Sequence, residues 1–246
     1  MTTNVATPTV RLVAISAGLG SPSSTRLLAD RLIAEAERGL RDRGIEPEVT
    51  VIELRDHAVH IASHLVTGVA EPRLAAALEE VRRADGLIAV SPVFNGSYAG
   101  LFKSFFDLFA PDDLVGIPVA LGATGGSARH SLVLEFAIRP LFTYLRTTPT
   151  PTAMFAATAD WGGRDGRPGD LDERVRRQAG ELVTAVAHRL GTTAASDPRS
   201  AEVAAPTIAA TGDDFTAAAR AERARREEHD GFAKLMSEYA NVPLSA

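Results

Sequence analysis

The feature that most constrains the fold is an alternation of short apolar runs with longer amphipathic runs between residues 10 and 190. The short runs are rich in Val, Ile and Leu, and each longer run carries apolar residues at helical spacing. We predict strands at 10–15, 48–54, 86–91, 117–123 and 151–157. We predict helices at 27–40, 71–84, 98–109, 130–145 and 171–190. Because such an alternation is typical of parallel strands joined by helices, the sequence predicts a doubly wound, five-stranded α/β domain.

Composition excludes several classes of function. None of the 246 residues is cysteine, which rules out disulfides, thiolate nucleophiles and cysteine zinc sites. A net charge of -5, with both signs interspersed, gives no electrostatic reason to bind nucleic acid or an anionic membrane. No run approaches the roughly 18 apolar residues of a membrane-spanning helix, and the N-terminus lacks a signal-peptide pattern. We therefore expect a cytoplasmic protein with no nucleic-acid or membrane partner.

The composition changes after residue 191. An Ala/Ser/Thr/Pro-rich stretch with little periodicity is typical of a linker. It is followed at 215–239 by a helical pattern with an apolar stripe of Phe232, Leu235, Met236 and Tyr239. We expect one domain at 1–191 and an extension of linker and helix at 192–246. Whether the stripe covers its own chain or a neighbour stays open.

Ligands of an open parallel sheet bind beyond the carboxyl ends of the strands, so the loops after the first, third and fourth strands matter most. The first loop, residues 16–26, combines two glycines with several hydroxyls and ends in Arg26. Small residues and hydroxyls before a helix favour an anion. The third glycine of a dinucleotide fingerprint would fall at Ser23, so the loop suits a terminal phosphate monoester better than a pyrophosphate.

The other two loops carry complementary groups. Residues 91–98 place a proline, an Asn-Gly pair and Phe94 after the third strand, which suits an aromatic ring with a polar edge. Residues 122–130 again join glycines and hydroxyls. Each loop alone could be an ordinary turn. Because all three meet at one crevice, we predict a single ligand site there.

The hydroxyl-rich first loop, SPVFNGS with LFKSFFDLF, and GATGGS together resemble the NAD(P)H-dependent FMN reductases of the flavodoxin-like fold. More closely, the chain resembles actinobacterial FMN reductases that work with luciferase-like monooxygenases. The resemblance covers residues 10–190 and departs at Phe94, where the family usually has tyrosine, and at Ser104, where it usually has asparagine. It implies strand order 2-1-3-4-5, FMN as cofactor, NADPH or NADH as reductant and a homodimer or homotetramer. It also implies delivery of reduced flavin to a partner flavin-dependent monooxygenase.

The resemblance assigns three groups of FMN contacts. The FMN phosphate is assigned to Ser16, Ser23, Ser24, Thr25 and Arg26. The isoalloxazine edge is assigned to Pro92, Val93, Phe94, Asn95, Gly96 and Ser97. The pyrimidine end of the ring, or the ribityl chain, is assigned to Thr124, Gly125, Gly126 and Ser127. Because hydride passes directly from nicotinamide to flavin N5, no catalytic side chain is implied.

Two alternative functions remain compatible with this fold. One is a reductase with bound FMN that reduces quinones or azo dyes, and the other is a flavin-binding electron carrier without enzymatic activity.

Two other enzyme classes are excluded because the spacing of their motif residues does not match. A short-chain dehydrogenase needs lysine four residues after its tyrosine, where Phe102 follows Tyr98. A serine hydrolase needs glycine two residues after its serine, where Arg129 follows Ser127.

Some polar and aromatic residues stay ambiguous. His57, His60 and His64 share one side of a helix, but no carboxylates cluster with them, so we expect a surface segment and no metal site. The Trp161 side chain either covers the predicted ligand pocket or only packs against the rest of the protein. Lys103 and Asp107, at i and i+4, suggest a structural pair.

The sequence does not choose between NADPH and NADH. The basic residues available for a 2′-phosphate are Arg129, Arg139 and Arg164. An apolar run offers weak support for self-association, and it comprises Leu101, Phe102, Phe105, Phe106 and Phe109.

Overall fold

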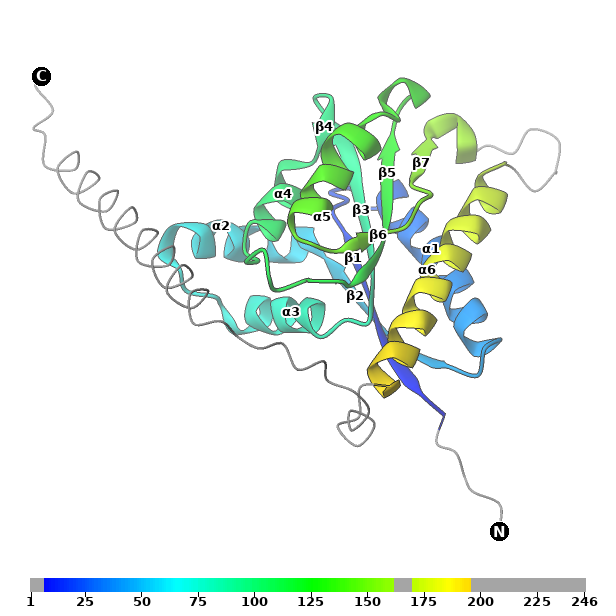
Figure 1. Cartoon of the computed structure of the whole chain (residues 1–246). Helices are drawn as coiled ribbons and strands as arrows, with labels where there is room; N and C mark the ends of the chain where they lie inside the picture. Colours follow the sequence, from blue (N-terminus) through cyan, green and yellow to red (C-terminus); the bar gives the residue numbers. More distant parts are fainter. Residues whose placement is uncertain (1–6, 162–169, 196–246) are drawn as a thin grey trace, which may run out of the picture. The chain divides into compact units, whose positions relative to one another are not determined.

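The computed structural model describes residues 7–161 and 170–195, and it contains a central sheet between two layers of helices (Figure 1). The parallel strands are β1 (Thr9–Ser16), β2 (Glu46–Glu53), β3 (Gly86–Phe94), β5 (Pro118–Gly125), β6 (Thr148–Pro149) and β7 (Met154–Ala157). Their order is β2-β1-β3-β5-β6, and β7 also pairs with β5. The two-residue β4 (Ser97–Tyr98) is antiparallel to β3. The predicted order 2-1-3-4-5 is confirmed, with β6 and β7 together in the fifth place.

The predicted fifth strand, 151–157, is wrong in its bounds. The chain reaches the sheet earlier, at Thr148, and leaves it between β6 and β7. Pro149 and Pro151 stand at this break, and proline has no N–H to donate to a strand ladder. The opposite edge strand, β2, also contains a proline, Pro47.

Strand periodicity explains the two helical layers. On β1, Leu12 and Ala14 belong to the core shared with α1 (Ser24–Arg41) and α6 (Asp170–Ala195). Val13 and Ile15 face the other core. That side is covered by η1 (Leu54–His57), α2 (Ala58–Thr67), α3 (Pro72–Arg82), α4 (Gly100–Phe106) and α5 (Arg139–Tyr144).

The predicted helix at 130–145 is not one regular helix. A 3₁₀ turn, η2 (Ala128–His130), is followed by a π-helical turn, η3 (Leu134–Ile138), and then by α5. Pro140 cannot donate a bond to the carbonyl four residues earlier, so a regular α-helix would lose a bond here. Phe136, within the π turn, is 77% exposed.

The aromatic part of the apolar run builds the core. Phe102, Phe105, Phe106 and Phe109 are buried, and Phe102 and Phe106 contact Phe142 of α5. Phe102 and Phe106 therefore join α4 to α5, and the four rings belong to the core.

The predicted helix at 215–239 and the 192–246 extension lie, from residue 196 on, outside the described residues. The preceding helix, α6, runs to Ala195. Within 7–161 and 170–195, no helix is both long enough and apolar enough to span a membrane.

Candidate functional site

A cavity of about 310 Å³ lies at the carboxyl ends of β1, β3 and β5. Its walls come from all three predicted loops and from the segment after β7. They are formed by Ser24, Pro92, Val93, Phe94, Thr124, Gly125, Gly126, Thr158 and Trp161. The structure therefore brings residues of all three predicted groups together.

The first loop is closely packed around Gly18. A Cβ atom at this position would lie 2.0 Å from the Ser23 Oγ, so a larger residue needs a rearrangement. Ser23 is the N-cap of α1, and its Oγ accepts a hydrogen bond from the Arg26 N–H at 3.2 Å. The loop therefore ends at the N-terminus of α1, where the backbone N–H groups of the first turn lack partners within the helix.

Two predicted hydroxyls are buried. The Ser16 Oγ, at the end of β1, has no hydrogen-bond partner among the residues that the structure describes. A buried hydroxyl of this kind can serve a ligand. The Thr25 Oγ1 lies 2.8 Å from the Thr124 Oγ1. This second contact fixes the first turn of α1 against the end of β5, so Thr25 joins two of the loops.

Arg26 is held by carboxylates. Its Nε donates to Asp30 at 2.7 Å and its Nη1 to Glu53 at 2.5 Å. The hydrogen bond to Asp30 raises the pKa of Arg26 above its usual value, and Glu53 adds to the effect. Arg26 is not among the residues that form the cavity wall. A phosphate at this loop would have to share the guanidinium with both acids.

The second loop is a tight hairpin. Asn95 and Gly96 have φ values of 49° and 80°, and they join β3 to β4 through the pairs Phe94–Ser97 and Val93–Tyr98. Two positive φ angles are typical of a type I′ turn, which Asn-Gly favours. The Ser91 Oγ donates to the Pro92 carbonyl and accepts from the Ala99 N–H, which fixes the base of the hairpin. The hairpin presents Phe94, 46% exposed, at the cavity.

The segment after β7 contributes Trp161 to the cavity wall, a residue whose role the sequence left open. It ends η4 (Thr158–Trp161), directly after β7. Its ring lies 5.2 Å from the Arg31 guanidinium carbon, in a cation–π arrangement. Thr158, which the sequence analysis missed, lines the same wall. The available signal was its position after the fifth strand, at the carboxyl end of the sheet.

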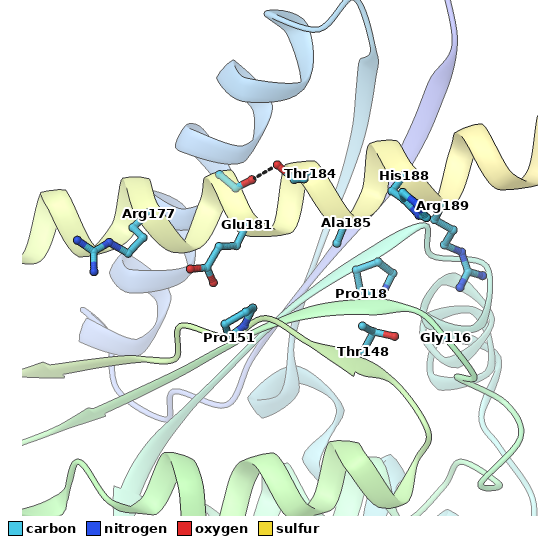
Figure 2. Close-up of a pocket in the computed structure, with 11 residues that line it drawn as sticks. Gly116, Pro118, Thr148, Pro151, Arg177, Glu181, Thr184, Ala185, His188 and Arg189 are labelled. Carbon is cyan, nitrogen blue, oxygen red and sulfur yellow. Dashed lines mark hydrogen bonds between the residues drawn. The ribbon is translucent and has the colours of Figure 1, made fainter.

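A second hollow, of about 700 Å³, lies between α6 and the starts of β5 and β6 (Figure 2). Its polar groups are largely engaged within the protein. Glu181 accepts hydrogen bonds from the Thr152 N–H at 2.8 Å and hydroxyl at 2.6 Å, and Thr184 donates to the Gly180 carbonyl. None of the predicted site residues lines it. We therefore take the smaller cavity as the candidate functional site.

Among the described residues, no group of three or more His, Cys, Asp or Glu side chains could hold a metal ion, and this includes His57 of η1 and His60 and His64 of α2. The His60 Nδ1 lies 3.6 Å from the Glu71 Oε2. Burial lowers the pKa of His57, and the charge of Arg73 contributes. Lys103 of α4 and Asp107, the C-cap of this helix, form an exposed ion pair.

Comparison with known proteins identifies the family. The family model described as NADPH-dependent FMN reductase matches residues 10–162. An FMN reductase (NADPH) from Pseudomonas aeruginosa is 40% identical over 151 residues, 61% of this chain and 78% of the relative. The NADH-dependent FMN reductase SfnE of Pseudomonas putida is 37% identical over 174 residues, 71% of this chain and 91% of the relative.

A solved oxidoreductase structure from Corynebacterium diphtheriae is also similar. It is 41% identical, with a TM-score of 0.70, and the match covers 73% of this chain and 98% of that one. The family match spans the strands and loops that build the cavity, from β1 to Trp161. With that match over more than half of its length, the chain belongs to the NADPH-dependent FMN reductase family.

Proposed function

We propose that the cavity at the carboxyl ends of the strands is where this oxidoreductase binds FMN and receives NAD(P)H. Its family and relatives make it an enzyme that uses FMN with NADPH or NADH. The observation that carries the site is the convergence of three separate loops on one cavity. FMN supplies the electron acceptor, since its ring takes a hydride from the nicotinamide.

The residues present suit each part of FMN. The N-terminal amides of α1, with Ser23 and Ser24, face an anion favourably, and the Ser16 hydroxyl is available for a further hydrogen bond. Phe94 and Trp161 offer flat apolar faces for the ring. The backbone amide of Gly126, which follows β5 in the cavity wall, can donate to a ring oxygen, where negative charge grows on reduction.

The proposed activity is tested by an anaerobic titration of the protein and FMN with NADPH, and separately with NADH. We expect the flavin absorbance band to bleach, because hydride transfer from the nicotinamide to the flavin ring abolishes the absorbance of oxidised flavin. The relative rates then rank the two reductants. A protein that binds FMN but does not bleach it would be an electron carrier. Absence of FMN binding would refute the site.

We propose further that reduced flavin leaves the enzyme for a partner monooxygenase. A volume of about 310 Å³ is at the small end of the ~300–1,000 Å³ common for ligand pockets. FMN would therefore stay partly exposed, which favours its release. A coupled assay with a flavin-dependent monooxygenase tests the transfer. Faster turnover of quinones or azo dyes than of free FMN would favour the alternative acceptors.

We also propose that the enzyme self-associates through the face formed by α4, η3 and α5. A groove of about 610 Å³ runs between these elements, and its wall includes Tyr98, Phe109 and Leu141. Phe136 and Tyr144, also in the wall, are 77% and 70% exposed. One face thus carries both protruding rings and a groove, which suits a twofold pairing of two copies.

Replacing Phe136 with aspartate is expected to convert an oligomer to a monomer, because it places a charge in the proposed apolar contact. Light scattering at micromolar concentration measures the change. Val115→Asp is the control, since Val115 is an exposed apolar residue, 50% exposed, that lies before β5 and is not part of the groove wall. A wild-type monomer, or an oligomer unaffected by Phe136→Asp, would contradict the proposal.

A further inference from the structure

Arg55 connects the first loop to the end of a neighbouring strand. It belongs to η1, which follows β2, and its Nη1 donates to the Gly20 carbonyl at 2.8 Å. Gly20 lies in the middle of the loop, where glycine leaves the backbone free to adopt many conformations. The bond from Arg55 removes part of that freedom.

The same bond fixes the direction of a loop amide. In a trans peptide, the carbonyl oxygen and the following N–H point in opposite directions. With the Gly20 carbonyl held toward Arg55, the Ser21 N–H must point away from it. The Arg55 guanidinium also offsets the partial negative charge of the Gly20 carbonyl oxygen. Both effects favour an anion on the side of the loop away from Arg55.

Glu53 holds Arg55 in place and couples it to α1. Its Oε2 accepts from the Arg55 Nη2 at 2.8 Å, and its Oε1 accepts from the Arg26 Nη1 at 2.5 Å. The Glu53 side chain is only 15% exposed, so solvent screens these contacts weakly. One carboxylate therefore orients the two arginines that flank the loop.

We infer that Arg55, oriented by Glu53, is a positioning residue that shapes the first loop for the terminal phosphate of a flavin nucleotide. The inference rests on the proposed function, since it assumes that this loop receives the phosphate of FMN. Arg55 is assigned a role through the loop and not a direct contact with the ligand. Asp56, 3.7 Å from its Nε, also offsets its charge.

A comparison of FMN with riboflavin isolates this role, because riboflavin has the same ring and ribityl chain without the phosphate. We expect Arg55→Met to weaken FMN binding about tenfold, the effect of one hydrogen bond to a charged group, and to leave riboflavin binding unchanged. Flavin fluorescence quenching measures both affinities. Arg55→Lys, which retains one cation, is expected to restore part of the preference for FMN.

The control is Arg83→Met, which removes an exposed arginine paired with Glu79 at the end of α3. It should leave both affinities unchanged. An equal loss of FMN and riboflavin binding in Arg55→Met would mean a general structural role and would overturn the inference, as would unchanged FMN binding. If Arg55→Met fails to fold, the same ratio measured in Arg55→Lys decides. Wild-type protein that binds neither flavin would instead overturn the proposed function.

Discussion

Gly18→Ala is expected to weaken FMN binding by about a hundredfold, the equivalent of two hydrogen bonds to a charged phosphate. The new Cβ would stand 2.0 Å from the Ser23 Oγ, so the serine must abandon its position at the N-terminus of α1. The contacts with the Ser23 and Thr25 Cβ atoms, at 3.1 Å each, leave little room to accommodate it. Fluorescence titration with FMN measures the loss.

Gly180→Ala is the matched control for this substitution. Gly180 lies within α6, and nothing stands within 4 Å of the position of its Cβ. Alanine should stabilise the helix by about 0.5–1 kcal/mol and leave FMN affinity unchanged. Wild-type affinity in Gly18→Ala would show that the phosphate lies elsewhere.

Phe106→Ala is expected to lower the free energy of unfolding by about 3–5 kcal/mol. Phe106 is 1% exposed, and its ring centroid lies 4.8 Å from those of both Phe102 and Phe142. Truncation leaves a cavity between α4 and α5 and removes four aromatic contacts at once, with Phe102, Phe105, Phe109 and Phe142. Urea unfolding, followed by circular dichroism, measures the change.

Phe136→Ala serves as the comparison, because Phe136 is 77% exposed on the same side of the sheet. Its effect on unfolding should stay within about 0.5 kcal/mol when measured at a concentration where the protein is monomeric. A loss below about 1 kcal/mol in Phe106→Ala would mean that the aromatic cluster relaxes around the gap.

The architecture was predictable because its signals are local. The alternation of apolar and amphipathic runs predicts a parallel sheet, and parallel strands place the three loops at the same end of it, whereas the strand order came from the family resemblance. The Asn95–Gly96 turn was equally visible, since its backbone preference belongs to those two residues. Breaks in regular structure were harder to predict. Two examples are the split between β6 and β7 and the π turn at Leu134–Ile138. Both depend on how prolines compete with neighbouring contacts.

Partners distant in sequence were not predictable. The sequence assigned Arg26 to the phosphate from its place at the end of the loop, but Glu53, which binds it, lies at the end of β2, 27 residues away. The same holds for Thr25 and Thr124, which are 99 residues apart. Such pairs form only when helices and strands pack together, so spacing along the sequence does not predict them. Their assignment to FMN stays a prediction until the variants are measured.

The prolines at the two outer strands of the sheet have a consequence for assembly. Pro47 in β2, and Pro149 and Pro151 around the gap between β6 and β7, interrupt the row of N–H donors that a free strand would offer to another molecule. Edge-to-edge pairing of sheets, the usual route to fibrils and continuous intermolecular sheets, is thereby discouraged at both margins. Copies of this enzyme that meet at high concentration are therefore expected to make few contacts of strand against strand.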